Sequence, residues 1–247
     1  MTEYRISGSF QSLWRNLEKD ILRKQPVTRG SWQSLDVSDS RHHDVFELLN
    51  VTAVYSVPHL TVLRKEVQPQ LPWADEHFVE RVSGIPYNPP PSHEKWSGHK
   101  GNNGIHLDES GRFSHTYPER FWPVYDQADD VRRGIRYSYG DMDDVLVLLK
   151  NNLLTRQAYL PIWFPEDTGA LDRRVPCTLG YHFQYDPVRE MLNVTYMIRS
   201  CDFVRHFRND VYLASRLLLW VGDNLGVNAG DLVMHIMNLH LMRGDRK

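Results

Sequence analysis

The stretch TLGYHFQYDPVREMLNVTYMIR, residues 178–199, carries the strongest indication of the fold class. β-Branched and aromatic residues alternate with polar ones in 178–185 and again in 191–199, which is the period of a half-buried strand. Asp186 and Pro187 between them are typical turn residues. The stretch therefore predicts two strands joined by a turn.

The segments on either side mix helical and strand patterns. Helices are predicted over residues 10–24, 73–82, 142–150 and 211–226. A strand or strand pair is predicted over 45–57, and a further strand over 158–164, where Pro161 indicates a bulge or an edge position. Residues 230–241 form a final apolar element. Because strands and helices do not alternate regularly, we expect an α+β fold with a mixed sheet flanked by helices.

Residues 85–120 differ from the rest of the chain. They are rich in proline, glycine and histidine, and few apolar residues recur with a period. This composition predicts a long loop or insertion within a single domain of residues 1–247. Its histidines match no zinc-ligand spacing, so we expect no bound metal.

Composition places the chain among ordinary globular proteins. It has 247 residues, of which 41% are hydrophobic and 24% charged, with a formal net charge of −2. That length suits one sizeable core, and the balanced charge argues against a general binder of nucleic acid or membrane surfaces. Neither a membrane-spanning run nor a secretory signal is evident, and Cys177 and Cys201 are too few for a disulfide framework. We therefore expect a cytoplasmic protein.

Two short motifs can carry chemistry. The sequence RSCD at 199–202 follows a predicted strand, and Arg199 beside the Ser200 hydroxyl suits a phosphate. The alternative is a solvated turn. Cys177 heads the other strand, where nearby arginines could lower its pKa and make it a nucleophile. A buried, inert thiol is the alternative.

Taken together, the motifs of residues 122–240 resemble the thymidylate synthase family. The pieces in the family's order and at nearly its spacing are Pro123-Val124-Tyr125, Thr155-Arg156, Pro176-Cys177, RSCD at 199–202, Gly230-Asp231 and His240. The resemblance implies a thymidylate synthase-like fold, 5,10-methylenetetrahydrofolate as co-substrate, and a homodimer with shared active sites.

Within the family, two details are most similar to the phage-type deoxycytidylate hydroxymethylases. Cys177 is followed by Thr178, where uracil-specific members have a histidine. Residues 207–210 read FRND, which places Asp210 eight residues after Asp202, where uracil-specific members have an asparagine. This resemblance implies that the expected compartment is the bacterial cytoplasm, or the cytoplasm of the host if the chain is phage-encoded.

The resemblance also implies roles for single residues. Cys177 would be the nucleophile that attacks C6 of the pyrimidine, and Tyr125 would lie near the C5 proton transfer. Glu76 is the expected catalytic glutamate, with Glu80 as the alternative. The expected ligands are Arg199 and Ser200 for the 5′-phosphate, Arg156 for the same phosphate across the dimer interface, Asp210 for the base, His240 for the sugar, Asn209 as a further substrate ligand, and Asp202 for the folate. Gln157 and Met242 depart from the family, because they replace an arginine and a sugar-binding tyrosine.

Asp210 also has a physical interpretation of its own. Cytosine offers a C4 amino donor and an N3 acceptor, so a carboxylate can accept from the amino group while a proton held at N3 completes the pair. The same carboxylate facing the C4 carbonyl of uracil would be unpaired, at a cost of roughly 1–3 kcal/mol. The alternative is a cap for the helix predicted over 211–226.

The implied reaction is transfer of a one-carbon unit to C5 of dCMP, followed by addition of water, giving 5-hydroxymethyl-dCMP and tetrahydrofolate. We expect the hydroxymethyl product because the given sequence ends seven residues after His240, whereas thymidylate synthases continue into a tail that covers the folate. Residues 85–120 could replace that cover. The alternatives are a CMP hydroxymethylase, a methyl-forming pyrimidine synthase and a non-catalytic nucleotide-binding relative.

Overall fold

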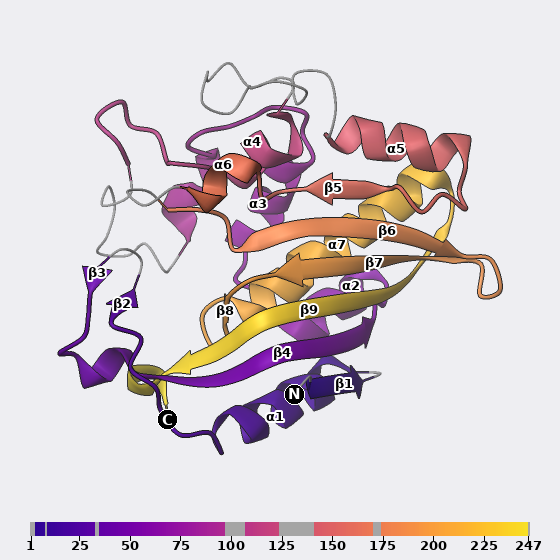
Figure 1. The fold of residues 1–247 in the computed structure, drawn as a ribbon. Helices are drawn as coiled ribbons and strands as arrows, with labels where there is room; N and C mark the ends of the chain where they lie inside the picture. Colours follow the sequence, from indigo (N-terminus) through magenta and orange to yellow (C-terminus); the bar gives the residue numbers. More distant parts are fainter. Residues whose placement is uncertain are drawn as a thin grey trace.

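The computed structural model describes residues 3–7, 9–32, 35–96, 107–123, 141–169 and 174–246. The strands are β1 (Glu3–Ser7), β2 (Ser31–Trp32), β3 (Leu35–Asp36), β4 (Val45–Ser56), β5 (Tyr159–Pro161), β6 (Thr178–Asp186), β7 (Met191–Ile198), β8 (Cys201–Asp202) and β9 (Asn228–Met242). Seven of them form one sheet in the order β1-β4-β9-β7-β6-β5, with β8 beside β9 (Figure 1). The short strands β2 and β3 pair separately.

The sheet is mixed. The stretch 178–199 forms the antiparallel pair β6–β7, and β4–β9 and β5–β6 are also antiparallel. By contrast, β1–β4, β7–β9 and β8–β9 are parallel. The α+β class and the mixed sheet predicted from the sequence are confirmed.

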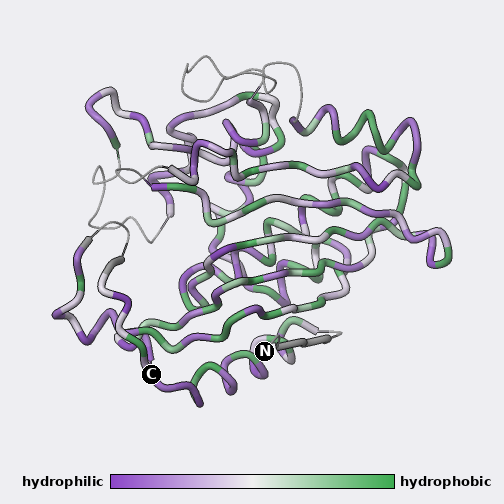
Figure 2. Tube along the Cα trace, in the orientation of Figure 1, coloured by the Kyte–Doolittle hydropathy of each residue, from purple (hydrophilic) through white to green (hydrophobic). Residues whose placement is uncertain are grey.

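Helices cover one face of this sheet. They are α1 (Phe10–Ile21), α2 (Leu60–Val67), α3 (Trp73–Arg81), α4 (Tyr117–Phe121), α5 (Met142–Asn151), α6 (Pro165–Thr168) and α7 (Phe207–Leu225). The long α7 packs on β7 and β9, and Phe207 of α7 stacks on Phe10 of α1. Hydrophobic and hydrophilic residues alternate along the strands (Figure 2), so that one set enters the core beneath these helices.

Several element boundaries differ from the sequence-based predictions. Helix α7 begins at Phe207 rather than residue 211, because Phe207 is fully buried against the aromatic cluster of Phe10, Trp14 and Phe203. The strand predicted over 158–164 ends at Pro161, and the final apolar element is the strand β9. Strands β1 and β8 and helix α2 were missed.

The segment 85–120 contains more structure than a loop. A 3₁₀ turn spans Pro91–Lys95, and α4 follows with Thr116 as its N-cap and Glu119 completing a capping box. The single-domain prediction for residues 1–247 stays a prediction. In the part of the chain that the structure describes, none of the helices is long and apolar enough to span a membrane.

Candidate active site

The loop that carries Cys177 is held by the residue that follows β7. The Arg199 backbone N–H donates to the Cys177 carbonyl at 2.9 Å. Its Nε and Nη2 donate to the carbonyls of Pro176 (2.8 Å) and Val175 (3.2 Å). Arg199 therefore fixes the backbone of the Cys177 loop, and its Nη1 donates to none of the described residues.

Cys177 itself is half-buried and close to several charges. Burial is the largest influence and raises the pKa of its thiol. The positive charges of Arg199 and Arg174 lower this pKa, and the negative charge of Asp210 raises it. The raised pKa keeps the sulfur protonated at neutral pH. If Cys177 is to act as the predicted nucleophile, bound substrate must therefore change these surroundings so that the thiolate forms.

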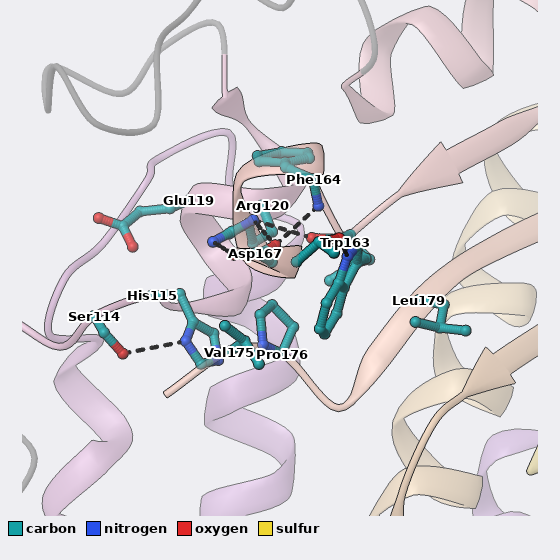
Figure 3. A network of polar contacts seen from close by, with 12 residues as sticks. Ser114, His115, Glu119, Arg120, Trp163, Phe164, Asp167, Val175, Pro176 and Leu179 are labelled. Atoms are coloured by element: carbon teal, nitrogen blue, oxygen red, sulfur yellow. Dashed lines mark hydrogen bonds and ion pairs between the residues drawn. The ribbon is translucent and has the colours of Figure 1, made fainter. Parts of the chain in front are cut away.

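A second set of contacts holds the same loop from the residues just before α4. The Ser114 hydroxyl donates to the Arg174 carbonyl at 3.0 Å, and His115 Nδ1 lies 3.2 Å from the same oxygen. Ser114 and His115 are also in contact with each other (Figure 3). Burial lowers the pKa of His115 to about 3, with a further contribution from the positive charge of Arg120. The ring is therefore neutral, and its Nδ1–H donates to the carbonyl.

A buried ion pair lies next to this contact. Arg120 of α4 binds Asp167 of α6 through two hydrogen bonds, Nη1 to Oδ2 at 2.8 Å and Nη2 to Oδ1 at 3.0 Å (Figure 3). Arg120 Nη1 also donates to the Ile162 carbonyl, and Asp167 Oδ2 accepts from the Phe164 N–H. The segment 85–120 is thus built into the support of the Cys177 loop.

Asp210 lies inside α7, in its first turn. The N-cap of α7 is His206, so the alternative that Asp210 caps this helix is wrong. Its Oδ2 accepts a hydrogen bond from Cys201 Sγ at 3.3 Å. Burial raises the pKa of Asp210 to about 6, while Cys201 and Arg81 lower it. Both protonation states of this carboxyl are therefore accessible near neutral pH.

A chain of hydroxyl groups continues from Thr178, the residue after Cys177. Thr178 Oγ1 is hydrogen-bonded to Tyr117 OH at 3.0 Å and to Tyr196 OH at 2.9 Å. Burial raises the pKa of Tyr117, and the nearby Cys177 adds to the rise. Tyr117 of α4 is thus a wall of the Cys177 site, which sequence reasoning missed because a tyrosine in a long loop gives no signal of its own.

Arg81 was missed in the same way. It is the last residue of α3, it is 6% exposed, and its guanidinium carbon lies 4.0 Å from the centre of the Tyr117 ring. The available signal was its spacing, because Arg81 falls one turn after His77 on the same face of a predicted helix. That face turned out to be buried.

Asp202 and His240 are brought together by the β8–β9 pair, in which they are direct neighbours. Asp202 Oδ1 accepts from the backbone N–H groups of Val204 (3.0 Å) and Arg205 (2.9 Å). His240 Nδ1 lies 3.1 Å from Asn238 Oδ1. Burial lowers the pKa of His240, against the effect of Asp202, which raises it. Asp202 therefore shapes the turn into α7 with Oδ1, while its Oδ2 forms an ion pair with Arg205 Nε at 3.8 Å.

The two candidate glutamates have structural partners. Glu76 is half-exposed and forms an ion pair with Lys95 Nζ at 2.7 Å. Glu80 is buried and accepts from the Ser92 hydroxyl at 2.6 Å, with His77 Nδ1 at 3.2 Å. Both carboxylates are thus tied to the 3₁₀ turn, and either one must exchange these partners to act as a catalytic glutamate.

The other predicted ligands occupy different surroundings. Arg156 is exposed, and its carbonyl is 3.0 Å from His182 Nε2 of β6. Asn209 is buried, and its Oδ1 accepts from the Gln70 N–H at 2.9 Å, which ties α7 to the loop between α2 and α3. Ser200 is half-buried beside Arg199.

Two further predictions concern Tyr125 and a metal site. Tyr125 lies outside the described residues. Among the residues that are described, no group of three or more His, Cys, Asp and Glu side chains is placed to hold a metal ion.

Comparison with known proteins identifies the family. The sequence profile described as "Thymidylate synthase" matches residues 94–245. The chain belongs to the thymidylate synthase family. It is 22% identical over 209 residues to a protein of Methanococcoides burtonii named "Putative thymidylate synthase", covering 85% of this chain and 79% of that protein. Thymidylate synthases transfer a one-carbon unit from methylenetetrahydrofolate to a nucleotide, which agrees with the class of reaction predicted from the sequence.

The fold agrees with this assignment. The crystal structure of thymidylate synthase from phage T4 matches with a TM-score of 0.63 at 16% identity, over 93% of this chain and 76% of that one. The thymidylate synthase-like architecture predicted from the sequence is confirmed.

Proposed function

We propose that the chain is a folate-dependent C5 hydroxymethyltransferase that converts dCMP, methylenetetrahydrofolate and water to 5-hydroxymethyl-dCMP and tetrahydrofolate. The observation that carries the proposal is Asp210, a half-buried residue in the first turn of α7 whose carboxyl is desolvated and does not cap the helix. Its charge raises the pKa of Cys177, so the two side chains are electrostatically coupled.

The protonation of Asp210 suits cytosine. An ionised carboxylate accepts from the C4 amino group, and the protonated form can in addition donate to N3. A pKa of about 6 makes either form available at little cost near neutral pH. Uracil instead presents a C4 carbonyl, which an ionised Asp210 would repel.

The chemistry follows from the residues around Cys177. Its thiolate sulfur bonds to C6, the C5=C6 electron pair shifts to form C4=C5, and the C4=N3 pair moves onto N3, which takes up a proton; the product is a nucleophilic enamine. C5 then attacks the folate-borne carbon and loses its proton, and the folate leaves as tetrahydrofolate. Water adds to the exocyclic methylene, the aromatic ring is restored, and the Cys177 thiolate is released.

The remaining ligands are assigned by the same proposal. Arg199 Nη1 and Ser200 would hold the 5′-phosphate at the end of β7. Asp202 Oδ2 would bind the folate in place of its ion pair with Arg205, whose Nε is 3.8 Å away. Trp96 supports that position, because it lies 5.3 Å from the His206 ring, and His206 is within electrostatic reach of Asp202. An aromatic surface beside a carboxylate suits a flat heterocycle with N–H donors.

A homodimer is part of the proposal. The sheet face opposite α1 and α7 carries half-exposed, mainly apolar side chains from three neighbouring strands, namely Val54, Thr195, Met197, Val233 and His235. A second copy of this face would bury them. Arg156 is exposed beside β6 of the same sheet, where it could reach the phosphate of a partner subunit.

One observation favours CMP as the alternative substrate. Met242 stands where the family has a sugar-binding tyrosine, and it is 1% exposed. Its thioether donates no hydrogen bond, so the usual recognition of the sugar hydroxyl is absent at this position.

Release of tritium from C5 tests the proposal, with dCMP, CMP and dUMP, each with and without the folate. We expect folate-dependent release and a 5-hydroxymethyl product with a cytidine nucleotide, and little release with dUMP. Asp210→Asn should reverse the preference. A methylated product formed with dihydrofolate identifies a methyl-forming synthase, and binding without release identifies a non-catalytic relative. Preference for dUMP by the wild type would overturn the assignment of the base.

A further inference from the structure

Arg81 has no role in the mechanism described above. Its side chain is buried, and its guanidinium lies over the Tyr117 ring. Its Nε is buried without a hydrogen-bond partner, and none of its guanidinium nitrogens donates to a described residue. Burying a charged donor without an acceptor is costly. The arrangement therefore indicates that a ligand supplies the missing acceptor.

Arginines in similar settings elsewhere in the protein are paired. Arg216 lies 4.1 Å over the Phe78 ring, as Arg81 lies over Tyr117, but its Nη1 binds Asp75 at 2.7 Å. Arg120 lies 4.4 Å over a phenylalanine ring, and two of its nitrogens bind one carboxylate. Stacking on an aromatic ring thus does not by itself account for an unpaired guanidinium in this structure.

The position of Arg81 connects it to the pocket of Cys177. The Tyr117 ring beneath its guanidinium is hydrogen-bonded to Thr178, the residue after the nucleophile. The charge of Arg81 also lowers the pKa of Asp210 against burial, so the two groups lie within electrostatic reach. The described structure forms no ion pair between them. A ligand that contacts both groups would meet a donor at Arg81 and an acceptor at Asp210.

We infer that Arg81 is a base-recognition residue, whose guanidinium donates to N3 of cytosine while Asp210 accepts from the C4 amino group. The inference rests on the proposed function. Cytosine presents a donor beside an acceptor on this edge, and Asp210 with Arg81 presents the complementary order. Uracil presents the reverse order, so the pair adds to the discrimination already expected from Asp210.

The pairing also serves the chemical step. Addition of the Cys177 thiolate to C6 moves an electron pair toward N3. When Asp210 is ionised it has no proton to give, and Arg81 is then the donor that faces the growing charge. A fixed cation at that point stabilises the transition state more than the ground state.

Replacing N3 by C–H in the nucleotide tests the contact directly. Isothermal titration without folate would measure binding of dCMP and CMP and of their 3-deaza analogues to the full chain, to Arg81→Met and to the matched control Arg216→Met. We expect the 3-deaza change to weaken binding to the wild type and to Arg216→Met by about tenfold or more. It should weaken binding to Arg81→Met by less than about threefold, because the partner of N3 is already lost.

The inference would be overturned if the 3-deaza change weakened binding equally in wild type and Arg81→Met. Binding of both cytidine nucleotides by Arg81→Met with unchanged affinity would also overturn it. Circular dichroism and cooperative unfolding would check the fold of each variant. If Arg81→Met does not fold, Arg81→Gln provides the same comparison with a shorter neutral side chain. Failure of the wild type to bind either cytidine nucleotide would refute the proposed function, and that result is distinct from an unchanged 3-deaza penalty.

Discussion

Replacing Asp210 by asparagine should stabilise the protein while it alters specificity. Burial raises the pKa of Asp210 from 3.8 to about 6, so the folded state disfavours the charged carboxylate. That difference corresponds to about 3 kcal/mol. Because the residue keeps some contact with solvent, we expect about 2 kcal/mol in practice. Asparagine has nearly the same shape and no charge, so it avoids this cost.

The sign of the effect fixes its pH dependence. A folded pKa above the unfolded value means that the proton is bound more tightly in the folded state. The contribution of Asp210 is therefore most favourable below pH 4, and it is lost as the pH rises through about 6. Relative to wild type, Asp210→Asn should gain little stability at pH 4 and about 2 kcal/mol at pH 7–8.

Urea denaturation at a fixed protein concentration, repeated between pH 4 and 8, would measure the difference. Asp223→Asn is the matched control, because Asp223 is an exposed residue near the other end of the same helix. The effect of this control is subtracted at each pH. A remaining difference between wild type and Asp210→Asn that is independent of pH, or that grows toward pH 4, would refute the reasoning.

Three further predictions concern the chemistry, the dimer and the support of the site. Cys177→Ala should abolish C5 tritium release but keep nucleotide binding by calorimetry, and appreciable turnover by this variant would contradict the mechanism. Mixing Arg156→Ala with Cys177→Ala subunits should restore part of the activity, and no recovery despite proven subunit exchange would count against a shared site. Asp167→Ala should lower the free energy of unfolding by about 3–5 kcal/mol, because Arg120 is left charged and buried; a urea-measured loss below about 1 kcal/mol would show that the pair is not essential.

The elements with strong periodicity could be predicted from the sequence because each pattern is local. The alternation over 178–199 is set by which residues face the core, and it appears in the structure as β6 and β7. Element ends were less predictable. Helix α7 extends back to Phe207 because distant aromatic residues of α1 bury its first turn, and such packing leaves no local pattern.

The candidate site residues likewise fall into two groups, those recognised from local motifs and those whose position required the fold. The motif residues Cys177, Arg199 and Asp202 could be found from the sequence, because their types and spacing are those of the family whose profile matches the chain. The sequence could not decide whether Asp210 caps a helix or faces a pocket, since both interpretations fit its position. The start of α7 decided against the cap.

The sequence by itself determined the α+β class, the family and the motif that contains Cys177, because all three depend on residue types at short, ordered spacing. Only the tertiary structure decided which additional side chains lie near Cys177. Arg81 at the end of α3 stacks on Tyr117 of α4, which is hydrogen-bonded to Thr178 at the start of β6. Asp210 of α7 is coupled to Cys177 electrostatically. Burial and electrostatic coupling depend on distances through space, which residues far apart in the chain acquire only when it folds.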